Sequence, residues 1–307
     1  FTFLSSDGKT QLHGMLWEPE GVAVRAVLQI CHGVAEHIAR YDGFARALNE
    51  QGIVVAGHDH LGHGKSLPEG GTPVYFGDGN TWNTVVDDIY VLHQRLKQRY
   101  PDVPLCIMGH SMGSFLTRTY LIRYPGTVKA AVIMGTGWQP RAAITGGLAL
   151  ANAIAAVSGE NATSELVTEL AFGSYNKLFA PNRTKVDWLS ADESNVDDYI
   201  ADPLCGADAT VGLFRQMLHG IRFNQRQSHL RQMDREMPVL FVAGDKDPVG
   251  NCGKGVRQTY DAFRAAGMRD CTLKLYPGLR HEILNEKAYT ADITKNIEAW
   301  LLSRLEK

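Results

Sequence analysis

The stretch Leu105-Cys106-Ile107-Met108-Gly109-His110-Ser111-Met112-Gly113-Ser114 decides the fold of this chain. Its first four residues are apolar, as is typical of a buried strand. A Gly-x-Ser-x-Gly pattern follows, and the residues from Phe115 to Tyr124 have the apolar spacing of a helix. A strand, a sharp turn and a helix in this order are the setting of a nucleophile elbow. The sequence therefore predicts that Ser111 is a nucleophile.

Gly109 and Gly113 flank this serine at two residues on either side. The serine of an elbow has a strained backbone, and a side chain at either glycine would collide with the neighbouring strand or helix. A functional nucleophile elbow also needs other catalytic groups around it. We expect an oxyanion hole upstream, and an acid and then a histidine downstream, each at the end of a strand.

Short apolar runs alternate with helical patterns along most of the chain. Strands are predicted at 11–17, 26–30, 53–56, 128–134, 239–243 and 272–276, and helices at 41–51, 82–100, 255–266 and 289–305. This alternation predicts an α/β fold, with a mostly parallel twisted sheet that helices cover on both faces.

The strand patterns stop between residue 135 and about residue 225. Helical patterns replace them at 142–157, 164–179 and 209–221. An insertion after the strand that ends near Met134 predicts a helical cap over the carboxyl edge of the sheet, where such folds bind ligands. We expect a core of residues 1–137 and 226–307 and a cap, or lid, of residues 138–225.

The general base is expected among the three histidines that follow Ser111, namely His219, His229 and His281. A serine hydroxyl is a poor nucleophile at neutral pH and needs a base within hydrogen-bond reach. His219 lies in a predicted cap helix and His229 in the link back to the core, whereas His281 follows a core strand. His281 is therefore the predicted base.

Two aspartates compete for the role of the acid. Asp245 directly follows the strand 239–243, where a carboxylate has the alternative roles of turn cap or solvated side chain. Asp247 lies further into the loop and has the Gly-x-x-Asp spacing usual in this fold. We predict that Asp247 fixes the imidazole tautomer and stabilises the imidazolium, with Asp245 as the alternative.

The oxyanion hole requires two preorganised backbone N–H groups. One is expected from Met112, the residue after the nucleophile, and the other from the loop after the strand 26–30. That loop contains His32-Gly33-Val34, and the Val34 N–H is the predicted donor.

Several motifs resemble the α/β-hydrolase superfamily: Asp59-x-x-Gly62-x-Gly64-x-Ser66, Gly109-His110-Ser111-Met112-Gly113 and the terminal histidine loop. Others resemble its monoacylglycerol lipase and lysophospholipase-like branch: His32-Gly33-x-x-Glu36-His37-x-x-Arg40-Tyr41, Gly278-x-x-His281-Glu282 and Asp202-Pro203-Leu204-Cys205. The resemblance implies a capped α/β hydrolase that uses no cofactor and acts on an ester of a single long acyl chain. Ala35 departs from it, because the branch usually has glycine there, and this bears on the oxyanion loop.

The stretch His58-Asp59-His60-Leu61-Gly62-His63 is rich in a residue that binds zinc. It is a tight loop with no further cluster of histidine or cysteine, so we expect a structural loop beside the active site and no metal.

The amino-acid composition limits which binding partners and which cellular compartment are expected. The 307 residues carry 31 basic and 33 acidic side chains, so neither nucleic acid nor an anionic membrane is expected as an obligatory partner. Five widely spaced cysteines and no signal-peptide pattern predict a reducing, cytoplasmic location. The uncharged stretch 142–159 is shorter and more polar than the ~20 apolar residues of a membrane span. It suits an acyl-chain tunnel or a lid in transient contact with a membrane surface, and equally a packing helix.

These observations together predict a serine ester hydrolase that cleaves monoacylglycerol- or lysophospholipid-type esters through an acyl-enzyme on Ser111. Acidic residues in the cap keep a serine aminopeptidase open, because related enzymes hold a peptide amino terminus with cap carboxylates. An acyltransferase and a low-turnover, ligand-binding relative are further alternatives.

Overall fold

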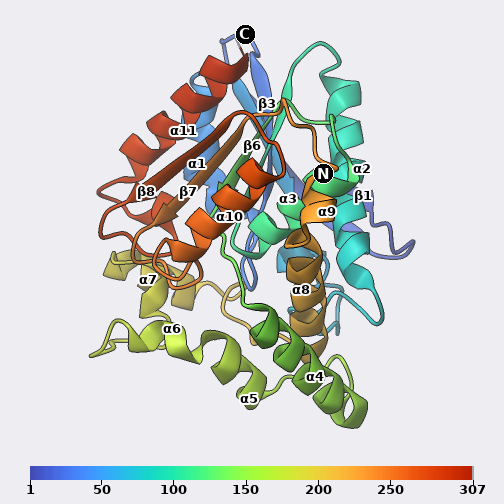
Figure 1. Cartoon of the computed structure of the whole chain (residues 1–307). Coiled ribbons are helices and arrows are strands. Elements are labelled where there is room, and N and C mark those ends of the chain that lie inside the picture. Colours follow the sequence, from blue (N-terminus) through green and yellow to red (C-terminus); the bar gives the residue numbers. More distant parts are fainter. Residues whose placement is uncertain (306–307) are drawn as a thin grey trace.

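The centre of the protein is an eight-stranded sheet, seen in a computed structural model that describes residues 1–305 (Figure 1). The strands are β1 (Thr2–Leu4), β2 (Gln11–Trp17), β3 (Ala26–Cys31), β4 (Ile53–His58), β5 (Leu105–His110), β6 (Ala130–Met134), β7 (Val239–Gly244) and β8 (Cys271–Tyr276). Their order is β1-β2-β4-β3-β5-β6-β7-β8, and all pairs from β4 to β8 are parallel. The predicted mostly parallel sheet is confirmed, with antiparallel β1 and β2 added at one edge.

Helices cover both faces of the sheet, and this explains the apolar strands. Every residue of β3, β4, β5, β6 and β7 is buried. Helices α1 (Asp42–Asn49) and α11 (Thr290–Leu305) pack on one face, and α2 (Thr81–Arg99), α3 (Met112–Arg123) and α10 (Lys254–Ala265) pack on the other. Because side chains alternate along a strand, a strand between two helical layers is apolar at nearly every residue.

The register of the sheet gathers four loops at one edge. Cys31 at the end of β3 is paired with Gly109, and Met134 at the end of β6 is paired with His110. Gly244 at the end of β7 is paired with Tyr276 at the end of β8. The loops that carry the predicted site residues therefore leave the sheet side by side, at the carboxyl edge where ligands bind in such folds.

Between β6 and β7 the chain adds no strand to the sheet and is mainly helical. Most of its helices gather at the lower end of the molecule in Figure 1, whereas the last one lies higher, near α3. The helices of this segment are α4 (Arg141–Ser158), α5 (Glu165–Thr168), α6 (Ser174–Lys177), α7 (Glu193–Ala201), α8 (Val211–Asn224) and α9 (Gln227–Leu230). The inserted helical cap is confirmed, whereas its limits at residues 138 and 225 stay a prediction.

Two parts of the cap differ from the sequence-based expectation. The helix predicted at 164–179 is interrupted by a π-helical turn, Glu169–Gly173, between α5 and α6. Helix α7 was not predicted, because few of its residues are apolar. It begins at an N-cap, Asp192, whose carboxylate accepts the Ser194 N–H.

Helix α4 is also more apolar than expected. Its 18 residues have a mean hydropathy of 1.3, and by length and composition it is long enough to cross a membrane. It packs against α8, yet only 17% of it is buried. The expectation that this stretch is too short and too polar for a membrane span was therefore too strict.

Candidate active site

Ser111 lies at the sharp turn between β5 and α3. Its backbone has φ 54° and ψ −122°, a strained conformation for a residue with a side chain. The turn is held by the Ser111 N–H, which donates to the Met134 carbonyl at 3.1 Å, and by the Ser114 hydroxyl, which donates to the Ser111 carbonyl at 2.6 Å. The expected elbow geometry is thus present.

The two glycines of the elbow have no room for a side chain. A Cβ at Gly109 would collide with the Gly113 carbonyl and the Thr117 hydroxyl. A Cβ at Gly113 would collide with the carbonyl of Cys31 in β3. The steric expectation for both positions is confirmed, and helix α3 can approach the sheet this closely only because residue 113 is glycine.

His281 and Asp247 are brought together by the loops after β8 and β7. The Nδ1 of His281 lies 3.0 Å from each carboxylate oxygen of Asp247, and both residues are buried. Asp247 Oδ1 also accepts the Val249 N–H at 2.9 Å. Within residues 1–305, Ser111 makes no hydrogen bond to His281, as is common in catalytic sites without substrate. The elbow contacts this loop through His110, whose ring lies 4.7 Å from that of His281.

The other candidates for the acid and the base lie away from the pair formed by Asp247 and His281. Asp245 Oδ1 accepts the Gly278 N–H at 2.8 Å, so this carboxylate ties two loops together at the surface. His219 lies in α8, where Arg222 donates to it, and His229 lies in α9 against the ring of Phe223. The structure thus pairs the predicted base with Asp247 and not with Asp245.

The residues that carry the predicted oxyanion donors lie at the cavity beside Ser111. Val34 and Met112 line it, and their N–H groups donate to no other group within residues 1–305. Next to Val34, Ala35 adopts a φ of 52°, a region that favours glycine. Its carbonyl accepts the Gly206 N–H and the Tyr199 hydroxyl, each at 3.0 Å. Contacts from the cap therefore support the strained oxyanion loop.

Glu36 organises the oxyanion loop from inside the protein. One carboxylate oxygen accepts the Gly33 N–H at 2.5 Å and the Tyr41 hydroxyl at 3.0 Å, and the other accepts from Arg40 at 2.9 Å. His110 lies 3.3 Å from the first oxygen. A single buried carboxylate thus joins the oxyanion loop to the residue before the nucleophile.

Electrostatics in this cluster favours charged forms. Burial alone would raise the pKa of Glu36, but His110 and Arg40 hold the pKa well below its usual range. Burial alone would lower the pKa of His110, and the Glu36 carboxylate raises it above its usual value. Each of the two groups therefore stabilises the charged form of the other.

Arg40 extends the network to the histidine loop. Its two terminal nitrogens donate to the two oxygens of Glu282, at 2.7 and 2.8 Å, and Asn195 of α7 donates to the same carboxylate at 2.8 Å. Glu282 directly follows His281 in the chain. Apart from Asn195, the residues of this network lie in the motifs quoted for the family resemblance, but nothing local in the sequence indicated that they contact one another.

The histidine-rich loop packs as neutral rings. Burial lowers the pKa of His58 and of His63 to about 3. The His32 ring lies 4.2 Å from that of His60 at an angle of 35°, and its Nε2 accepts the His60 N–H at 3.0 Å. These contacts fix the loop against the oxyanion loop, in agreement with the structural role expected.

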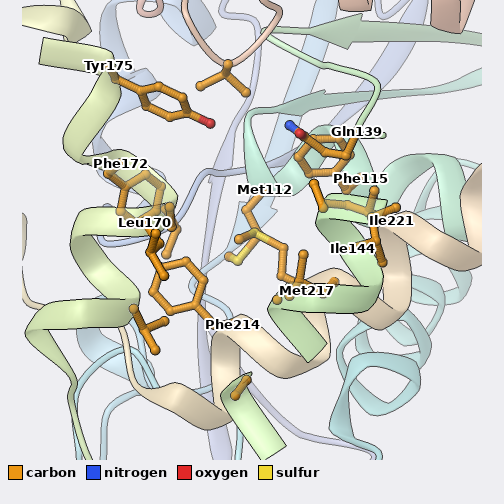
Figure 2. Close-up of a pocket in the computed structure, with 18 of the residues that line it drawn as sticks. Met112, Phe115, Gln139, Ile144, Leu170, Phe172, Tyr175, Phe214, Met217 and Ile221 are labelled. Carbon is orange, nitrogen blue, oxygen red and sulfur yellow. The ribbon is translucent and has the colours of Figure 1, made fainter. Parts of the chain in front are cut away.

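A cavity of about 390 Å³ opens from the elbow into the cap, within the range of small-molecule sites (Figure 2). Its labelled walls include Phe172 and Tyr175 from the cap segment after α5, and Phe214 and Met217 from α8. None of the described residues that line it is charged. Trp188 also lines this cavity, and its ring lies 5.1 Å from that of His281.

The sheet, the elbow and the cap define the class, and the chain is a hydrolase of the α/β-hydrolase fold. Residues 22–288 match the family model Hydrolase_4, described as serine aminopeptidase, S33. The chain belongs to this family.

Similar proteins carry the names of lipases and esterases. A monoacylglycerol lipase of Mycolicibacterium smegmatis is 31% identical, over 94% of this chain and 92% of that protein. The monoglyceride lipase of Mus musculus is 28% identical over 98% and 90%. Among solved structures, a thermostable carboxyl esterase from Bacillus coagulans in complex with glycerol has a TM-score of 0.92 at 26% identity, over 99% of this chain and 98% of that one.

Gly113→Ala tests the close approach of α3 to β3. Because the new methyl group meets backbone, we expect the free energy of unfolding to fall by about 1–3 kcal/mol, measured by denaturant unfolding. Gly146→Ala is the matched control, since Gly146 also lies inside a helix but has open space around it. This variant should gain up to about 1 kcal/mol from helix propensity. Equal effects of the two substitutions would contradict the steric explanation.

Asp247→Asn and Asp245→Asn separate the two carboxylates. If Asp247 orients His281, its amide variant should lose about 10⁴-fold in kcat, because the imidazole would be held in the wrong tautomer. Asp245→Asn keeps an oxygen for the Gly278 N–H, so its kcat should stay within a few-fold of the parent. Steady-state kinetics on a soluble ester checks both, and a larger loss for Asp245→Asn would reverse the assignment.

Proposed function

We propose that this protein hydrolyses carboxylic esters of single-acyl lipids, of the monoacylglycerol or lysophospholipid type, through an acyl-enzyme on Ser111. The observation that carries the proposal is the uncharged cavity that begins at Ser111 and runs into the cap. A single acyl chain buries apolar surface there and needs no charged partner. The relatives named as monoacylglycerol lipases support the same substrate class.

In the proposed reaction, Ser111 Oγ attacks the ester carbonyl while His281 Nε2 takes its proton. Asp247 holds the imidazole by Nδ1 and stabilises the imidazolium. The Val34 and Met112 N–H groups receive the developing oxyanion. The imidazolium then protonates the leaving alcohol, and a water activated by the same histidine releases the fatty acid.

The positions of the acidic residues in the cap disfavour a peptidase role. No acidic residue of the predicted cap lines the cavity, namely Glu160, Glu165, Glu169, Asp187, Asp192, Glu193, Asp197, Asp198, Asp202 and Asp208. Several have structural partners instead. Glu160 pairs with Arg215 at 2.5 Å, Glu169 with Lys177 at 2.8 Å, and Asp197 with Arg183 at 2.6 Å. A substrate ammonium group would meet no carboxylate in the cavity walls.

A panel of esters of graded acyl length and head group tests the function. We expect single-chain esters with a long acyl group to give the highest kcat/KM, and Ser111→Ala to lower kcat by about 10⁴-fold or more. Faster turnover of amino-acyl arylamides would point to the aminopeptidase. Transfer to an added alcohol would point to the acyltransferase, and tight binding with no burst of acyl-enzyme to the ligand-binding relative.

The cap also supports a proposed transient contact with lipid surfaces. Apolar side chains stand out from it, with Val157 88% exposed, Leu166 54% and Leu178 61%. They belong to α4 and the segments that follow it, which form the walls of the cavity on their inner side. An acyl chain that leaves a lipid aggregate at this face would have a short apolar path to Ser111. The five free cysteines support the proposed cytoplasmic location.

The double variant Val157→Gln and Leu178→Gln tests this contact. Burying one such side chain contributes about 1.5–3 kcal/mol, so binding to phosphatidylcholine vesicles should weaken by about tenfold or more. Turnover of a short, monomeric ester should not change. Val22→Gln is the control, because the Val22 side chain is also exposed but lies in the segment before β3, outside the cap. Co-sedimentation measures the vesicle binding. If the double variant binds vesicles as tightly as Val22→Gln does, the proposed role of the cap is contradicted.

A further inference from the structure

Three side chains of different chemistry meet where the cap rests on the oxyanion loop. His37 follows that loop, and Asp202 and Cys205 lie in the exposed segment after α7. His37 Nε2 lies 2.8 Å from Asp202 Oδ2. The imidazole nitrogen, the carboxylate oxygen and the Cys205 sulfur all lie within 4.8 Å of one another.

We propose that His37, Asp202 and Cys205 form a site for a single zinc-class metal ion, which joins the cap to the oxyanion loop. Nitrogen, oxygen and sulfur donors together select a borderline-soft ion such as Zn²⁺ over Ca²⁺ or Mg²⁺, which take oxygen ligands. Three protein ligands leave a fourth tetrahedral position for water. This site goes beyond the proposed ester hydrolysis and does not depend on it.

The geometry requires only small movements. Tetrahedral zinc holds such ligand atoms roughly 3.3–3.7 Å apart, so shifts of about 1 Å or less bring the three donors into place. Asp202 and Cys205 are half-buried, and the residues at 203, 204 and 206–208 are exposed, so no tightly packed side chains oppose such shifts. His37 is anchored on the buried side and is 8% exposed.

Charge and protons balance at the occupied site. The Cys205 thiol loses its proton to solvent. The proton that His37 Nε2 donates to Asp202 is exchanged for one on Nδ1, so that Nε2 is free to bind the ion. A thiolate and a carboxylate then neutralise the two positive charges of the ion. The guanidinium of Arg40, which acts on Cys205 electrostatically, is itself neutralised by Glu36 and Glu282.

Occupation would tether two segments that already touch. The Gly206 N–H donates to the Ala35 carbonyl at 3.0 Å, one residue after the proposed oxyanion donor and two before His37. A metal that binds only the folded protein raises its melting temperature by mass action. Zinc should therefore stabilise the docked position of the cap segment.

Calorimetric titration of the full chain with Zn²⁺, after treatment with a chelator, tests the site. We expect one ion per chain, release of one proton, and a rise in Tm. Substitution of a ligand should weaken binding by at least about tenfold, since even residues behind the ligands contribute that much. Cys205→Ser and His37→Gln should both show this loss, and Co²⁺ should give a thiolate-to-metal absorption band in the parent protein that is absent from Cys205→Ser.

Cys252→Ser is the matched control, because Cys252 is the exposed thiol most open to adventitious metal. It should bind zinc like the parent. The proposal is overturned if the parent binds no stoichiometric zinc, or if Cys205→Ser binds as tightly as Cys252→Ser. It is also overturned if the Co²⁺ complex lacks the thiolate band. None of these results depends on hydrolysis, so they leave the proposed function to its own test.

Discussion

The contact between helix α3 and strand β3 is the constraint on which the rest of the site depends. At Gly113 the helix comes so close to the Cys31 carbonyl that no side chain fits between them. This approach places the first turn of α3, with Met112, beside the loop that follows β3 and carries Val34. It also forces Ser111 into its strained conformation, because the chain must reverse within one residue after β5. Such strain persists only where the surrounding structure holds it.

The buried charges around Glu36 provide part of that support. Three loops that carry proposed site residues each contribute a member: Glu36 after the oxyanion loop, His110 before the nucleophile, and Glu282 after His281. Arg40 joins the two carboxylates. Burying charges in this way is costly, and removal of one partner leaves another unpaired, so the network favours a single arrangement of the three loops. Asn195 of α7 adds the cap to this arrangement.

The local patterns of the sequence predicted much of this structure. Strands buried on both faces are apolar throughout, and the glycines of the elbow have a direct steric cause, so both were predictable. The assignment of Asp247 needed more than a pattern: it depends on the register that pairs Gly244 with Tyr276 and brings two loops together. The network was not predictable, because Arg40 and Glu282 are far apart in the chain and each resembles an ordinary surface charge. The π-helical turn and α7 were missed because the apolar periodicity is weak there.

The cap explains why the same sheet and elbow serve many substrates. The proposed attack by Ser111 requires a carbonyl within its reach, and this requirement does not by itself distinguish an ester from an amide. Discrimination between substrates comes from the side chains that line the rest of the cavity. Here α8 presents Phe214 and Met217 to the cavity, while Arg215 points to the Glu160 carboxylate at 2.5 Å. Helix α8 thus contributes apolar side chains to the cavity wall and a charged side chain to an ion pair within the cap. This arrangement favours an apolar acyl chain over a charged peptide terminus.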